Sequence, residues 1–144
     1  MSPDQLFALG NPLALIGWIV LLLSPLSPKW ADRISGLAIP LILSVGYAGL
    51  ILSHFSRAEG GFDSLENVML LFTNPHAALA GWWHFLAFDL LIGAWIARTA
   101  RAERIHFALV IPCFALTFMF GPMGFLTFSA LRFIRTGLAQ GKEA

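Results

Sequence analysis

An apolar stretch that carries two ionisable side chains constrains this fold more than any other feature of the sequence. It runs over about residues 75–97, which is long enough to cross a bilayer, and it holds His84 and Asp89 near its middle. Ionisable groups are costly in hydrocarbon, so those that occur there usually face a bundle interior or a cavity. The stretch therefore predicts a membrane-spanning helix and a functional site on it.

The composition of the whole chain supports a membrane protein. Hydrophobic residues make up 58% of the 144 residues and charged residues 12%, whereas soluble domains average about 45–50% and about 25%. The net charge of +1 is too small to indicate a nucleic-acid partner. The cations instead gather at the ends of apolar runs, which is typical of membrane proteins. We predict a single integral membrane domain with the lipid bilayer as its surroundings, and the oligomeric state stays open.

No targeting segment is predicted at the start of the chain. The first residues lack the basic region of a signal peptide and the Arg- and Ser-rich character of an organelle transit peptide. We interpret the first apolar run as a retained anchor. The expected location is therefore a bacterial cytoplasmic membrane, which the protein crosses several times.

Four apolar regions predict an all-α, polytopic bundle of four transmembrane helices. Their approximate bounds are 6–23, 34–55, 75–97 and 106–133. Asn74 and Pro75 are a typical helix N-cap and first residue, so they mark the start of the third helix. Between the second and third helices, Asp63 and Glu66 resemble a capping box. Apolar residues at helical spacing follow, which predicts a short interfacial helix.

The last apolar region contains a break at Gly121-Pro122-Met123-Gly124 and allows two geometries. In a helix kinked at the break, five of the nine cations lie on one side of the membrane and four on the other. In a re-entrant hairpin the distribution is eight against one, which the positive-inside rule favours. Each arm of the hairpin would have only about 14 residues, and irregular backbone at that depth must be covered by protein. We expect four crossings with a kinked last helix.

His84 and Asp89 are the strongest candidates for a site. Five residues separate them, so on an ideal helix they point about 140° apart and do not pair directly. Each can line a different part of the bundle interior as a site residue. Each can equally be a hydrogen-bonded packing residue.

Five further residues are candidate ligand-binding groups. Tyr47 and His54 are seven apart and share one helix face, and Tyr47 is the natural hydrogen-bond partner for a buried Asp89. Trp82 and Trp83 either line a pocket for a flat or polyene-like molecule or pack in the core. His76, near the start of the third helix, is either interfacial or part of the site.

No cofactor or metal is predicted. The four histidines are dispersed, and the chain has no HxxxH, HExxH or CxxC pattern and no phosphate-binding GxxxxGK[ST] loop. The functions that remain for the chain are a reaction that needs no cofactor and simple ligand binding.

Two segments carry a resemblance to a known family. The segment GGFDSLENVMLLFTNPHAALAGWWHFLAFDLLIGAW at residues 60–95, and FMFGPMGFLTFSALR later in the chain, resemble the abscisic-acid-deficient-four-like family. The resemblance implies an integral membrane protein that meets a carotenoid or another isoprenoid-like lipid. Plant members act in neoxanthin formation, where a violaxanthin epoxide end group becomes an allene.

Chemically, that step needs an acid on the epoxide oxygen and a base on a vinylic proton. Asp89 as the acid and His84 as the base are the groups available for these roles. The first hypothesis is therefore a cofactor-independent isomerase of a carotenoid or similar lipid. The second is a non-enzymatic protein that binds lipid or acts as a scaffold subunit. A transporter is a weaker third hypothesis, because only one broken helix is evident.

Overall fold

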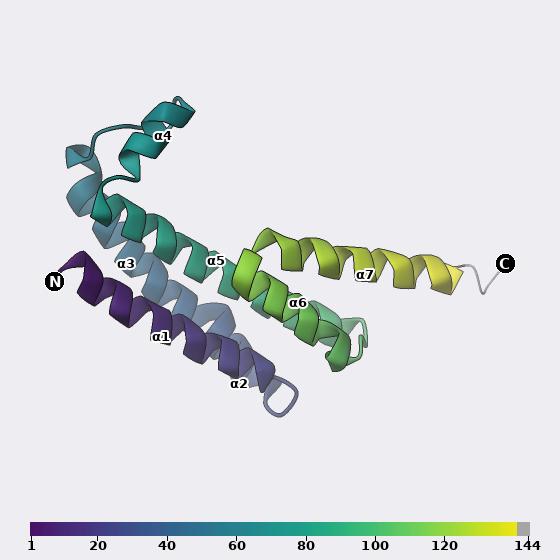
Figure 1. Ribbon diagram of the computed structural model, residues 1–144. Helices are drawn as coiled ribbons and strands as arrows, with labels where there is room; N and C mark the ends of the chain where they lie inside the picture. Colours follow the sequence, from purple (N-terminus) through teal and green to yellow (C-terminus); the bar gives the residue numbers. More distant parts are fainter. Residues whose placement is uncertain (141–144) are drawn as a thin grey trace.

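The computed structural model describes residues 1–140, and within them the fold is entirely helical, as predicted. The elements are α1 (Pro3–Leu22), α2 (Pro28–Arg33), the π-helical turn η1 (Ile34–Ala38), α3 (Ile39–His54), the 3-10 turn η2 (Phe55–Arg57), α4 (Leu65–Leu71), α5 (Pro75–Ala102), α6 (Phe107–Phe120) and α7 (Pro122–Gln140). Figure 1 shows α1, α3 and α5 lying side by side along the length of the bundle.

Three helical stretches are long and apolar enough to cross a membrane. They are Pro3–Leu22, Pro28–Arg57 and Pro75–Ala102, whereas Phe107–Phe120 is apolar but shorter. These helices indicate a membrane protein.

Helices α1 and α5 run in the same direction, and glycines allow them to approach closely. A methyl group at Gly17 would lie 2.5 Å from the Leu90 side chain, and one at Gly93 would lie 2.8 Å from the Trp18 ring. In a membrane the hydrophobic effect does not drive helices together, so they associate through close van der Waals packing. Small residues such as these glycines make that close packing possible. In the same register, Asn11 of α1 lies level with Trp82, about two turns before Asp89 on α5.

The second apolar region is irregular just before Pro40. Proline crowds the carbonyl of the residue four positions earlier, and the turn Ile34–Ala38 is widened to π-helical geometry, with the Ile39 N–H bonded to the Ile34 carbonyl. Ser35 is fully buried there and donates from Oγ to the Gly17 carbonyl at 2.7 Å. The second apolar region therefore continues from α2 through η1 into α3.

The short helix between the second and third apolar regions starts differently from the prediction. Its N-cap is Ser64, whose hydroxyl accepts from the Asn67 N–H at 3.1 Å. Asp63 instead accepts from the Asn67 side-chain amide at 2.9 Å, which lowers the pKa of its carboxyl. The predicted cap at Asn74 is confirmed, because its side chain accepts from the His76 and Ala77 N–H groups.

The last apolar region differs from the expected kinked helix. Gly121, at φ +47°, ends α6, and α7 turns back beside α6 to form a hairpin. Arg132 of α7 donates from Nε to Glu103 Oε2 at 2.8 Å, so α7 returns to the C-terminal end of α5. A helix that continued onward from Gly121 would carry Arg132 away from Glu103. The prediction of one helix over residues 106–133 is therefore wrong.

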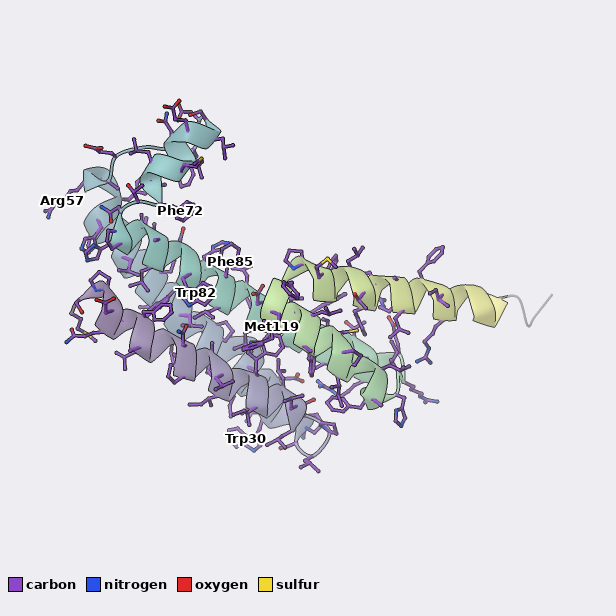
Figure 2. All side chains as sticks on the ribbon, viewed as in Figure 1. Trp30, Arg57, Phe72, Trp82, Phe85 and Met119 are labelled. Carbon is purple, nitrogen blue, oxygen red and sulfur yellow. The ribbon has the colours of Figure 1, made fainter. Side chains whose placement is uncertain are left out.

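Ion pairs gather at the end of the bundle where α5 stops. Arg101 contacts both carboxylate oxygens of Asp32, at 2.6 and 2.7 Å. Figure 2 shows Arg57 at the opposite end of the bundle, where α3 stops. Seven of the nine cations lie toward the C-terminal end of α5, namely Lys29, Arg33, Arg98, Arg101, Arg104, Arg132 and Arg135. Lys142 lies outside the described residues.

Candidate functional site

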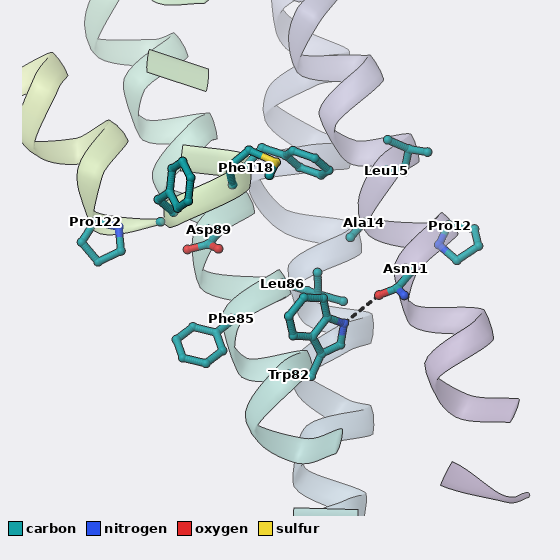
Figure 3. A pocket seen from close by; sticks show the side chains of 13 residues that line it. Asn11, Pro12, Ala14, Leu15, Trp82, Phe85, Leu86, Asp89, Phe118 and Pro122 are labelled. Carbon is teal, nitrogen blue, oxygen red and sulfur yellow. Dashed lines mark hydrogen bonds between the residues drawn. The ribbon is translucent and has the colours of Figure 1, made fainter. Parts of the chain in front are cut away.

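Asp89 lies in the middle of α5 and lines a large cavity. The cavity has a volume of about 720 Å³ and is mostly apolar. It lies between α1, α5 and the tip of the α6–α7 hairpin, as Figure 3 shows. Its lining residues are Asn11, Pro12, Ala14, Leu15, Trp82, Phe85, Leu86, Asp89 and residues 118–122.

One wall of the cavity is formed by a hydrogen bond between α1 and α5. The Trp82 indole N–H donates to Asn11 Oδ1 at 2.7 Å (Figure 3). The Phe7 ring packs on the same indole, with ring centroids 5.9 Å apart. Trp82 is therefore a cavity residue, which was one of its two predicted roles. Asn11 was missed, although a lone amide in the first apolar run was a signal of the same kind as Asp89.

The hairpin tip lies against the carboxylate. A methyl group at Gly121 would lie 2.6 Å from Asp89 Oδ1. Gly124 is equally confined, because a methyl group there would lie 1.9 Å from Thr117 Oγ1 on the other arm. Thr117 is fully buried and bonds the Cys113 carbonyl at 2.8 Å. These two glycines allow the chain to reverse directly over Asp89.

Trp83 is a packing residue and not part of this cavity. A methyl group at Gly10 of α1 would lie 2.4 Å from its Nε1, and one at Gly46 of α3 would lie 1.8 Å from its ring. The ring is therefore held between two helices that glycine allows to come close. Its Nε1 is buried and has no hydrogen-bond partner among the described residues.

His84 faces a different, smaller cavity. Its ring lies 5.7 Å from the Tyr47 ring and 4.6 Å from the Phe88 ring. This cavity has a volume of about 220 Å³, and aromatic residues that include Phe62 and Phe72 line it. Tyr47 was expected to reach Asp89 but contacts His84 instead. The predicted divergence of His84 and Asp89 is thus seen as two separate cavities, which share only Phe85.

His54 and His76, the other two histidines predicted as site residues, contact each other between α3 and α5. The rings of His54 and His76 stack at a centroid distance of 3.8 Å and an interplanar angle of 7°. His54 Nδ1 lies 3.3 Å from the Leu50 carbonyl in its own helix. This pair sits at the start of α5 and lines neither cavity.

The large cavity suits an apolar molecule that carries an oxygen function. Aromatic and aliphatic side chains form most of its wall, and small-molecule sites typically combine such walls with few polar groups. Asp89 has no hydrogen-bond partner among the described side chains, so its carboxyl can give a proton to a ligand or take one. Asp89 is also the only ionisable residue that lines this cavity in the described part of the chain. No three His, Cys, Asp or Glu residues within that part are placed to share a metal ion.

Comparison with known proteins identifies the family. No curated protein and no solved structure is detectably similar to the chain. The ABA DEFICIENT 4-like family matches residues 5–128, which include most of α1 with Asn11, the whole of α5 and the hairpin tip. The chain therefore belongs to the ABA DEFICIENT 4-like family.

Proposed function

We propose that this protein is a multi-pass membrane isomerase of a carotenoid or a similar isoprenoid lipid, with its active site at Asp89. The observation that carries the proposal is the lone carboxyl in a mostly apolar cavity of about 720 Å³. The family supports the choice of lipid, since its plant members act in neoxanthin formation. The bacterial cytoplasmic membrane is the proposed location, with α4 lying at its surface.

Asp89 carries both proton transfers in this proposal. The protonated carboxyl donates to the epoxide oxygen, so the C–O bond breaks and an alcohol forms. The carboxylate that results removes the vinylic proton, and the electron pair of that C–H bond completes the allene. One proton is given and one is taken, so the reaction is a balanced isomerisation without a cofactor.

His84 has no part in this chemistry, because it lines the other cavity. With Tyr47 it is assigned a secondary role in contacting ligand beyond Phe85. His54 and His76 stack on each other and are assigned to holding α3 against α5.

The second candidate function is lipid binding without turnover. It is favoured by the same isolation of Asp89, since a single carboxyl with no second ionisable group also suits a hydrogen bond to a hydroxyl. The two functions differ in whether bound lipid is converted.

The decisive experiment supplies an epoxy-carotenoid to the purified protein in lipid nanodiscs. Chromatography with mass detection then follows the epoxide and its allenic isomer. Wild-type protein is expected to form the isomer, and Asp89→Asn is expected to bind the carotenoid but not convert it. Asp4→Asn, the same change at an exposed position of α1, is the matched control and keeps full turnover. Unchanged turnover in Asp89→Asn rejects the acid role, and carotenoid recovered unchanged from wild type favours binding alone.

A further inference from the structure

The α6–α7 hairpin covers only half of α5. Helix α5 has 28 residues, which is about 42 Å at 1.5 Å per residue. Asp89 is its fifteenth residue, and the hairpin tip lies on Asp89. Helix α6 has 14 residues, or about 21 Å, against a hydrocarbon core of about 30 Å. Helix α6 is therefore too short to cross, and the hairpin tip, which lies against Asp89, is near mid-depth.

The second arm returns to the end where the first began. Arg132 contacts Glu103 and lies over the Trp95 ring, with its Cζ 5.8 Å from the ring centroid. Trp95 also contacts Phe128 of α7. These contacts place the start of α6 and the later part of α7 at the same, cation-rich end of the bundle. A bilayer normally keeps such an end on the cytoplasmic side.

The backbone at the tip meets the condition for a re-entrant turn. Irregular backbone at membrane depth must be bonded and covered by protein. The Gly121 N–H bonds the Thr117 carbonyl at 2.8 Å, and the Gly124 N–H bonds the Gly121 carbonyl at 3.1 Å. Both glycines are buried. The N–H groups of the two glycines are thus bonded and covered, while Asp89 faces the cavity.

A purely apolar groove leads away from the Asp89 cavity between α1 and α6. It has a volume of about 290 Å³ and shares Leu15 and Phe118 with the larger cavity. It continues along α1 to Leu22, which is seven residues or about 10.5 Å beyond Leu15. Asn11 and Asp89, the amide and the carboxyl of the combined space, line the larger cavity and not the groove.

From this arrangement we infer that α6–α7 is a re-entrant hairpin that builds a mid-membrane site for the neutral, oxygen-bearing end of an isoprenoid lipid. The end group lies at Asp89, and the hydrocarbon chain follows the α1–α6 groove. A charged headgroup is excluded, because its transfer to mid-depth costs far more than that of a hydroxyl, ketone or epoxide. The lipid class rests on the proposed function, whereas the re-entrant topology does not.

Cysteine accessibility tests the topology. In a Cys113→Ser background, single cysteines replace Ser27, Ser56 or Thr136, so that no charge is altered. A membrane-impermeant maleimide is applied to sealed vesicles of known orientation. The expected result is that positions 27 and 136 react from one side and position 56 from the other. Reaction of 136 from the same side as 56 requires a fourth crossing and overturns the hairpin.

Photolabelling tests the ligand. The probes are geranylgeraniol and geranylgeranyl phosphate, each with a diazirine at the far end of the chain, and labelled peptides are mapped by mass spectrometry. The neutral probe is expected to label residues 15–22 and 111–118, at least tenfold more than the phosphate does. Equal labelling by the phosphate, or labelling spread evenly over the exposed helix surfaces, overturns the site. Loss of turnover in the isomerase assay affects neither result, so the two proposals fail separately.

Discussion

Gly121 presents its backbone directly to the carboxylate of Asp89. A methyl group at this glycine would lie 2.6 Å from Oδ1, and its φ of +47° is unfavourable for any residue with a side chain. The two constraints act at one point, where α6 reverses over the middle of α5. The shape of the cavity and the path of the chain are therefore coupled through this contact.

Gly121→Ala is expected to destabilise the protein by about 1–3 kcal/mol, since it adds backbone strain and a clash. Thermal unfolding in detergent, followed by circular dichroism, measures the loss. Gly49→Ala is the control, because a methyl group at Gly49 meets nothing within 4 Å. That change lies within helix α3 and is expected to stabilise by about 0.5–1 kcal/mol. Equal effects of the two substitutions would contradict the contact.

Gly46→Ala tests the packing of Trp83. The added methyl group would lie 1.8 Å from the indole ring, which is already held on its other side by Gly10. Overpacking of this kind costs about 1–3 kcal/mol. In the double variant with Trp83→Leu, the smaller side chain makes room for the methyl group. We expect the Gly46→Ala penalty to fall by at least half in that background, measured as a shift in unfolding midpoint. Strict additivity of the two changes would show that Trp83 does not fill this space.

Local sequence signals predicted the helices and much of their capping. The helix cap at Asn74-Pro75 depends only on residues that are adjacent in the sequence, and it forms as expected. The five-residue spacing of His84 and Asp89 also foretold that they would not meet, because helical geometry alone decides it. These features depend on neighbours in the chain, which a single sequence displays.

The hairpin could not be predicted from neighbouring residues, because the Gly121-Pro122 break is compatible both with a kinked helix and with a reversal of the chain. The contacts that decide between them join distant residues, such as Arg132 with Glu103 and Gly121 with Asp89. The whole-chain charge count favoured the hairpin, but helix length weighed against it. Asn11 escaped notice for a similar reason, since its partner Trp82 is 71 residues away.

Low pH is expected to loosen the hairpin through Glu103. The hydrogen bond from Arg132 lowers the pKa of the Glu103 carboxyl below its ordinary value of 4.5. Because the folded pKa is the lower one, the pair stabilises the fold at pH values above 4.5 and loses this contribution as the pH falls through the folded pKa. The pair is exposed to solvent, so the effect is small and local.

Trp95 fluorescence measures this loosening, in a variant whose other tryptophans are replaced by phenylalanine. The cation of Arg132 lies over the Trp95 ring, so the emission is expected to change as the pH falls below 4.5 and through the folded pKa of Glu103. Glu103→Gln removes the titrating group and should flatten that change. A transition of equal size in Glu103→Gln would assign it to another carboxyl.

Asn11→Ala is expected to weaken lipid binding more than it weakens the fold. The substitution removes the acceptor of the Trp82 indole N–H, in a bond of 2.7 Å between two residues that line the cavity. A net hydrogen bond of about 0.5–1.5 kcal/mol corresponds to a roughly two- to tenfold loss of affinity. Quenching of tryptophan fluorescence by a bound polyene lipid measures that affinity in nanodiscs. Asn67→Ala, which removes an amide from α4 away from the cavity, is the control and should leave affinity unchanged. If both variants bind like wild type, Trp82 and Asn11 do not shape the ligand site.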